Sequence, residues 1–152
     1  MEFIQFLDRV EIEIIRMVEQ AGYSTEENTP LCLLSEAYVG FLKKQQKTIV
    51  ICTDNAKRRE GYTLIRKRNT DIFDRTANHI KKALRHEAVH VAQESNSGNL
   101  LNIKRSYKIN PSKIEALKGS TKISGEIEKE RQAYILEDKP KSVKKELEKY
   151  CL

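Results

Sequence analysis

Residues 86–90 of this chain read His86-Glu87-Ala88-Val89-His90, and this pentapeptide decides both the fold and the function that the sequence predicts. On an α-helix, positions i and i+4 lie on one face, so both imidazoles can reach a single metal ion. Glu87 lies about 100° further round such a helix and points towards the open side of that ion. The spacing therefore predicts a helix that carries a metal site with a carboxylate beside it.

The chemistry of such a site follows from its ligands. A zinc ion held by two neutral imidazoles and one further protein ligand keeps a fourth position for water. The ion lowers the pKa of that water from roughly 15.7 towards 7, so hydroxide becomes available at neutral pH. We expect Glu87 to be the general base that takes the proton and passes it to the leaving nitrogen. The motif thus predicts a hydrolase that cuts an amide bond.

The flanks of the motif are apolar on nearly every side, as expected for a helix buried through the centre of a domain. The apolar residues are Ile80, Ala83, Leu84, Ala88, Val89, Val91 and Ala92. In a chain with so few histidines, the pentapeptide arises by chance in roughly one sequence in a few hundred. His79 precedes His86 by about 10 Å along the same helix, so it cannot share the metal.

The third ligand is expected in residues 125–136, which have the pattern of a helix. At about 100° per residue, Glu130 falls within an apolar arc, whereas Glu128 falls on the opposite side. The other members of that arc are Ile127, Ala133 and Tyr134. A carboxylate among apolar neighbours favours a cation, so Glu130 is the expected ligand and Glu126, one turn earlier, is the alternative.

The stretch from Leu84 to Gln93 resembles the active-site helix of the zincin metallopeptidases. The metzincin branch would require Gly at position 93 and His at position 96, where this chain has Gln93 and Asn96. The segment Glu130-Arg131-Gln132-Ala133 resembles the second signature of the gluzincins, including the ImmA/IrrE-type peptidases. This resemblance implies Zn²⁺ as the cofactor, Glu130 as its third ligand and a protein or peptide as the substrate.

The cysteines offer an alternative ligand. Peptide deformylases combine the same motif core with an upstream Cys ligand, and Cys32 and Cys52 lie upstream of the motif in this chain. Deformylases also carry an Asp directly before the second motif histidine, where this chain has Val89. The three cysteines are odd in number and form no Cys-x-x-Cys pair. We therefore expect no disulfide framework and a reducing compartment.

The N-terminal residues 1–10 contain acidic side chains and no continuous apolar run. This pattern is typical of neither a signal peptide nor a membrane span, so we expect a cytoplasmic protein without a membrane partner.

The net charge of +6 is concentrated in residues 57–59, 66–68 and 139–149. These clusters could attract nucleic acid or an acidic protein, although solvated turns and a surface helix explain them as well.

Length and composition predict one α+β domain over residues 1–152, a minimal zincin-like domain with a buried active-site helix packed against a small sheet. Helices are expected over the first twenty-odd residues up to Gly22, over 31–42, from Thr70 or Asp71 to Glu94, over 111–118 and over 125–136. A further helix at the C-terminus, with Val143, Leu147 and Tyr150 on one face, is expected to dock on the rest of the domain.

A strand is expected at residues 48–53, with 62–65 as its partner and a polar turn at 24–30. In zincins, an edge strand beside the active helix binds the extended substrate as an added strand. One of the two expected strands is the candidate for that role.

The sequence therefore predicts a cytoplasmic zinc metallopeptidase of gluzincin type, with zinc on His86, His90 and Glu130 and with Glu87 as general base. Tyr134 or Tyr107 could donate to the oxyanion, and Gln93 and Glu94 could orient the histidines; these four side chains are secondary candidates.

Two other functions remain open at this point. One is a regulatory or nucleic-acid-binding module whose zinc site is structural or inactive, with the basic residues 57–68 on phosphates. The other is a zinc amidohydrolase that acts on an amide other than a peptide bond, such as a formylated terminus.

Overall fold

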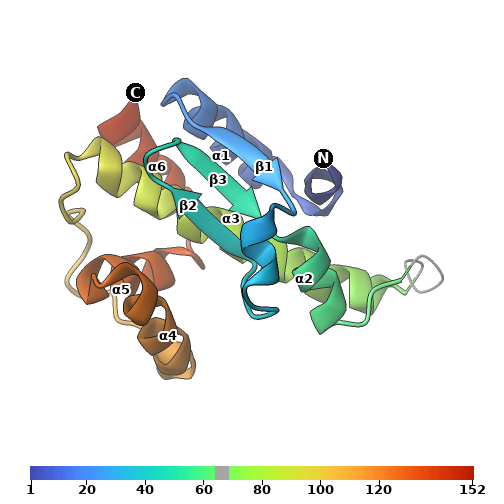
Figure 1. Cartoon of the computed structure of the whole chain (residues 1–152). Helices are drawn as coiled ribbons and strands as arrows, with labels where there is room; N and C mark the ends of the chain where they lie inside the picture. Colours follow the sequence, from blue (N-terminus) through green and yellow to red (C-terminus); the bar gives the residue numbers. More distant parts are fainter. Residues whose placement is uncertain (64–68) are drawn as a thin grey trace.

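The computed structural model describes residues 1–63 and 69–152, and it has the predicted α+β class (Figure 1). The α-helices of the described part are α1 Arg9–Gln20, α2 Thr53–Arg59, α3 Thr70–Ser95, α4 Ile114–Ser124, α5 Ile127–Leu136 and α6 Pro140–Cys151. Short 3₁₀ helices are η1 Glu2–Phe6, η2 Pro30–Leu33 and η4 Pro111–Lys113. The strands are β1 Ser24–Glu27, β2 Gly40–Lys43 and β3 Thr48–Ile51.

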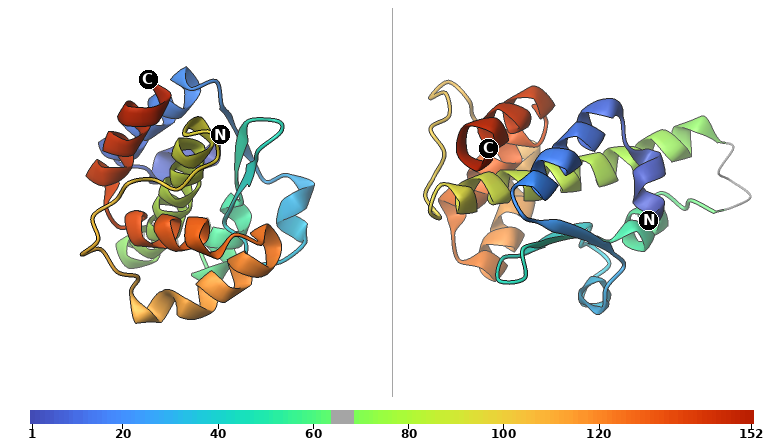
Figure 2. Two further views of the ribbon diagram at one scale, coloured as in Figure 1. Left: turned by 90° about the vertical axis from the view of Figure 1, so that its left-hand side faces the viewer. Right: turned by 90° about the horizontal axis from the view of Figure 1, so that it is seen from above.

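Helix α3 runs through the middle of the molecule, as the apolar flanks of the motif predict. Viewed down its axis, α1 and α6 cover one side, the sheet covers another, and α5 with α4 covers a third (Figure 2). Every residue from Leu84 to Gln93 is buried. The helix begins where the side chain of Asn69 accepts hydrogen bonds from the backbone N–H groups of Asp71 and Ile72. It extends one residue beyond the predicted end at Glu94.

The sheet has the strand order β1-β3-β2, with β1 parallel and β2 antiparallel to the central strand β3. Strand β3 confirms the prediction of a strand within residues 48–53, but it ends at Ile51, and Thr53 is already the first residue of α2. The predicted polar turn at 24–30 is wrong, because Ser24–Glu27 pairs along the edge of β3. The predicted partner at 62–65 is not a strand at Tyr62 and Thr63, and its last two residues lie outside the described residues.

The predicted helix at 31–42 is also wrong. Pro30 opens only the short helix η2, and residues 40–43 pair with β3. The apolar residues of this segment follow the period of a strand: Leu42 packs against the main core, whereas Phe41 packs against Val50 and the cysteines on the other face of the sheet. Strand β2 lies directly against α3 at Gly40, where an added Cβ atom would be 3.2 Å from Cβ of Ala83.

Helix α2 was not predicted, because the sequence analysis ends the strand at Thr53, where this helix already begins. The other helices follow the predicted pattern with shifted ends. The N-terminal helix is divided in two, because Asp8 caps α1 through a reciprocal capping box with Glu11. Gly119 does not end the helix after Asn110; the chain continues to Gly125, which adopts a left-handed φ of 74°. Helix α6 docks on α1 and α3, as predicted.

The expectation of no disulfide is wrong, because Cys32 and Cys52 form one, with their sulfur atoms 2.00 Å apart. The bond joins η2 to the residue that follows β3 and so fastens the loop that leads into β2. Bonded sulfurs cannot ligate a metal, which removes the deformylase-like alternative. Cys151 is free. None of the helices in the described residues has the length and apolar character that a membrane crossing requires.

Candidate metal centre

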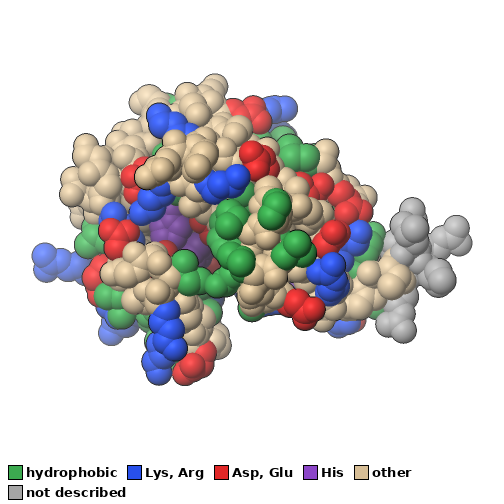
Figure 3. Space-filling model, in the orientation of Figure 1, with side chains coloured by type: hydrophobic (Ala, Val, Ile, Leu, Met, Phe, Trp, Pro, Cys, Tyr) green, Lys and Arg blue, Asp and Glu red, His purple; other side chains and the backbone are tan. Residues whose placement is uncertain are grey.

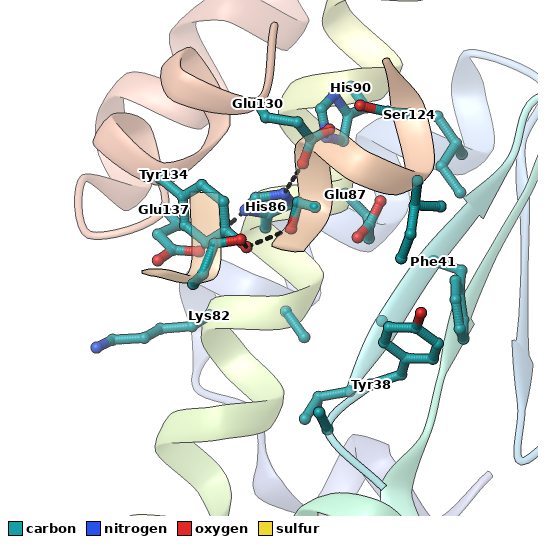
Figure 4. Close-up of a pocket in the computed structure, with 18 of the residues that line it drawn as sticks. Tyr38, Phe41, Lys82, His86, Glu87, His90, Ser124, Glu130, Tyr134 and Glu137 are labelled. Atoms are coloured by element: carbon teal, nitrogen blue, oxygen red, sulfur yellow. Dashed lines mark hydrogen bonds and ion pairs between the residues drawn. The ribbon is translucent and has the colours of Figure 1, made fainter. Parts of the chain in front are cut away.

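Three buried side chains from two helices converge at the centre of the molecule (Figure 4). His86 and His90 project from α3, and Glu130 reaches them from α5. The Nε2 atom of His86 lies 3.2 Å from Oε1 of Glu130, and the Nε2 atom of His90 lies 2.9 Å from Oε2 of the same carboxylate. One ligand atom from each residue falls within 4.8 Å of the others. This group could hold a metal ion.

The structure distinguishes among the glutamates of the 125–136 segment. Glu130 is buried and in contact with both histidines, as its place in an apolar arc predicts. Glu126 is half-exposed and pairs with Lys44 and Lys129, so the structure does not bring the alternative ligand to the site. Glu128 lies on the exposed side of α5.

The second ring nitrogen of each histidine has its own partner. Nδ1 of His86 donates to the carboxylate of Glu137 over 3.1 Å, and Nδ1 of His90 donates to Oε1 of Gln93 over 2.8 Å. Gln93 in turn donates to Gln132 on α5. These bonds fix both rings so that the Nε2 atoms face Glu130. Gln93 therefore has the predicted orienting position, whereas Glu94 pairs with Lys44 instead.

Glu137 is the site residue that sequence reasoning missed. It directly follows the last residue of α5, is 6% exposed, and pairs with the ammonium of Lys113 at 2.8 Å. Its backbone carbonyl accepts a hydrogen bond from Arg85, which also pairs with the buried Glu11 of α1. Its position one residue beyond the predicted helix and its acidic type were visible in the sequence, but its contact with His86 depends on how α5 docks.

Glu87 lies beside the histidines on the side of α3 that faces β2 (Figure 4). It is 7% exposed and lines a cleft between α3, α4, α5 and β2. Burial raises the pKa of this carboxyl, and the nearby His86 and His90 lower it only in part. A carboxylate with a raised pKa at a cleft wall suits a group that accepts and returns a proton.

The electrostatics of the converging residues are strongly coupled. Burial by itself lowers the pKa of His86, but its hydrogen bonds to Glu130 and Glu137 outweigh burial and raise the pKa to about 10. Burial tends to raise the pKa of Glu130, and the hydrogen bonds from His86 and His90 drive it well below its usual value. Both pKa shifts have the same cause, the close contact between the imidazoles and the Glu130 carboxylate.

The ring of Tyr134 packs against the site, but its hydroxyl points away towards α4. Its ring meets the His86 ring edge-on at 4.5 Å, and its hydroxyl bonds to Ser120 and donates to the carbonyl of Ala116 on α4. Burial raises the pKa of this hydroxyl to about 12. Tyr134 therefore ties α4 to α5 beside the histidines. The other candidate, Tyr107, packs against the core and does not line the cleft.

The cleft has a volume of about 370 Å³, within the range of pockets that hold small ligands or a few residues of a peptide. One wall is the edge strand β2 with the loop before it, and the opposite wall is formed by α4 and α5.

Some residues considered in the sequence analysis lie outside the cleft. His79, which was excluded from the predicted site, forms a hydrogen bond with Glu60 away from the cleft. Of the basic clusters, Lys57 pairs with Glu2, and residues 66–68 lie outside the described residues.

The donor set fits a small divalent cation. Two imidazole nitrogens and one carboxylate are the ligands of many catalytic zinc sites, and both imidazoles have second partners that fix their orientation.

Comparison with known proteins identifies the family of this chain but assigns no activity to it. No curated protein and no solved structure matches the chain. A family model described as a domain of unknown function, DUF8637, matches residues 3–152, and the chain therefore belongs to the DUF8637 family.

Proposed function

We propose that this protein is a zinc-dependent metallopeptidase of the zincin type, with His86, His90 and Glu130 as ligands and Glu87 as general base. The observation that carries the proposal is the carboxylate of Glu130, whose two oxygens lie against the Nε2 atoms of both histidines. Glu130 comes from a segment forty residues after His90, so their meeting is a property of the fold and not of the motif alone.

Bound zinc would supply a Lewis acid that polarises the scissile carbonyl and makes water more acidic. The protein's own groups do the rest. Glu87 accepts a proton from the attacking water and returns it to the leaving nitrogen, and its raised pKa brings it closer to neutrality for both steps. Glu137 and Gln93 keep the two imidazoles in one orientation while this happens.

The sheet supplies a place for an extended substrate. Strand β3 is central, so the predicted strand at 48–53 cannot offer a free edge. Strand β2 is an edge of the sheet and lines the cleft beside Glu87. We assign the substrate strand to this edge, where backbone N–H and C=O groups can pair with a peptide.

The test compares zinc content and peptide cleavage in the parent protein, Glu87→Gln and Glu130→Ala, with the exposed Glu128→Ala as a matched control. Glu87→Gln should retain the metal and lose turnover by a factor of about a thousand or more. Glu130→Ala should lose both, and Glu128→Ala neither. Full metal affinity in Glu130→Ala would refute the ligand set, and normal cleavage by Glu87→Gln would refute the mechanism.

A further inference from the structure

The direction of β2 along α3 defines two ends of the cleft. At the start of the strand, an added Cβ atom on Gly40 would lie 3.2 Å from Cβ of Ala83. Just after the strand, the ammonium of Lys44 lies 3.2 Å from a carboxylate oxygen of Glu94. The strand therefore runs beside α3 in the same direction, and the histidines lie between these two contacts, in a hollow of the surface (Figure 3).

The end of the cleft where β2 ends is balanced in charge. Lys44 pairs with Glu94 on α3 and, at 3.3 Å, with Glu126 directly before α5. Glu126 also pairs with Lys129 at 3.0 Å. Because each of these charged groups has a partner of opposite sign, this end offers no uncompensated charge to a substrate.

At the other end, Arg59 is held on the wall that leads into β2. It is the last residue of α2, and its guanidinium donates to the carbonyl of Ala37 over 2.8 Å. Ala37 precedes Gly40 in the loop before β2, so this bond places Arg59 at the end of the cleft where the strand begins. Arg59 lines the cleft and pairs with no carboxylate of the described residues. An arginine carries several N–H donors, so one bond to a carbonyl leaves others for a ligand.

Lys82 lies at the same end, on the floor of the cleft that α3 forms. It precedes the first motif histidine by one helical turn, and Figure 4 places it with Tyr38 at the end opposite to Ser124. Its ammonium lies 3.7 Å from one carboxylate oxygen of Asp138, whose other oxygen is paired with Lys113. Since Asp138 is shared with this closer cation, the charge of Lys82 is neutralised only in part.

We propose that Arg59 and Lys82 form a subsite for a carboxylate of the substrate, at the end of the cleft where β2 begins. The proposal rests on the proposed function and names the substrate class: a polypeptide with an acidic side chain, or its own terminal carboxylate, close to the scissile bond. Charge-assisted hydrogen bonds from arginine and lysine to a carboxylate are stronger than those between neutral groups.

The spacing along α3 gives the position of that carboxylate in the substrate. One helical turn separates Lys82 from His86 by about 6 Å along the axis. An extended peptide advances about 3.3 Å per residue. The acidic residue therefore lies roughly two or three residues from the scissile bond, on one side of it.

The experiment measures kcat/KM for peptides with one common core, in which glutamate or glutamine is placed in turn at each position on both sides of the scissile bond. The readout is the ratio of the glutamate value to the glutamine value. For the parent protein we expect a ratio of about ten at one position and on one side only. The ratio should fall to about one in Arg59→Gln/Lys82→Gln. In Arg59→Glu/Lys82→Glu, lysine should be preferred to glutamine at that position.

A second pair of peptides distinguishes the two sources of the carboxylate. Both end at the preferred position with glutamine, one as the free acid and one as the amide. A preference of about tenfold for the free acid assigns the subsite to the end of a chain. Equal rates for this pair, with the preference for glutamate retained, assign it to an acidic side chain.

The matched control is Arg58→Gln/Lys81→Gln. It removes the cation that precedes each proposed residue on the same two helices, and neither of these cations lines the cleft. The net charge of the protein falls by the same amount, so the ratio should equal that of the parent. A parent ratio near one at every position, with no preference for the free acid, overturns the subsite. So does an equal loss of the ratio in the control, which would assign the preference to overall charge.

Binding separates this proposal from the peptidase proposal. The labelled glutamate and glutamine peptides are titrated against the Glu87→Gln variant in the presence of zinc, where turnover is not needed for the signal. A preference of about tenfold for glutamate, lost when Arg59→Gln/Lys82→Gln is added, supports the subsite even if the parent cleaves no peptide. Equal binding of all these peptides, the free acid and the amide included, refutes it even if cleavage is found.

Discussion

Gly40 and Glu87 are so close that a Cβ atom on Gly40 would lie 3.3 Å from Cγ of Glu87 and 3.2 Å from Cβ of Ala83. The absence of a side chain at Gly40 lets β2 lie directly against the motif helix. We expect Gly40→Ala to displace Glu87 by a few tenths of an ångström and to lower peptide cleavage about tenfold, with zinc content unchanged.

The control for this substitution is Gly119→Ala. A Cβ on Gly119 meets nothing within 4 Å, and alanine favours the helix α4 in which Gly119 lies. Cleavage by Gly119→Ala should match that of the parent. Equal rates for the parent and Gly40→Ala would show that β2 does not constrain the position of Glu87.

The bond between Glu137 and His86 predicts an effect on metal affinity. Glu137→Gln keeps the shape of the side chain but removes the charge that orients and polarises the imidazole. We expect the zinc affinity to fall about tenfold to a hundredfold, as measured by competition with a chelator. Glu128→Gln, on the exposed side of α5, provides the comparison and should bind zinc like the parent.

The disulfide predicts an effect on stability. It closes a loop between residues 20 positions apart, so the double variant Cys32→Ser/Cys52→Ser should lose about 3 kcal/mol of unfolding free energy. Urea titrations with and without a reductant measure this, and the reductant should destabilise the parent but not the variant. Cys151→Ser, which removes no cross-link, should respond to the reductant as the parent does.

A buried carboxyl on α6 predicts that the free energy of unfolding depends on pH. Glu146 is 8% exposed, and its Oε2 has no hydrogen-bond partner among the residues that the structure describes. Burial raises the pKa of this carboxyl, and the nearby Lys149 and Lys145 oppose the rise in part. Since the folded pKa is above the unfolded value of 4.5, the protonated form favours folding below that value, and this contribution is lost as pH rises through the folded pKa.

Glu146→Gln is neutral at every pH and should therefore be more stable than the parent at neutral pH by about 1 kcal/mol. Below pH 4.5 the difference should disappear, because the parent carboxyl is then protonated as well. Urea unfolding midpoints of the parent and Glu146→Gln, measured at neutral pH and below pH 4.5, test this difference. Glu148→Gln, an exposed neighbour on the same helix, should show no such gain; a gain of the same size there would point to overall charge instead.

The parts of the fold that the sequence predicted have a strong local signal. Helix α3 has apolar residues on nearly every side around the motif, and β3 is a continuous run of apolar and β-branched residues. Glu130 was recognisable because a carboxylate interrupts an otherwise apolar arc of α5. In each case the pattern of a single segment was sufficient.

The errors have physical causes in long-range pairing. Strand β1 is polar, Ser24-Thr25-Glu26-Glu27, and is a strand because its backbone pairs with β3. The 31–42 segment is apolar enough for a helix, but its residues are divided between two faces of the sheet. The Cys32–Cys52 bond has no short-spacing signature.

The carboxylate of Glu130 on α5 lies against the Nε2 atoms of both imidazoles on α3. The meeting of the three side chains therefore depends on how α5 packs on α3, so a substitution that loosens this helix pair far from the histidines would also part the carboxylate from the imidazoles.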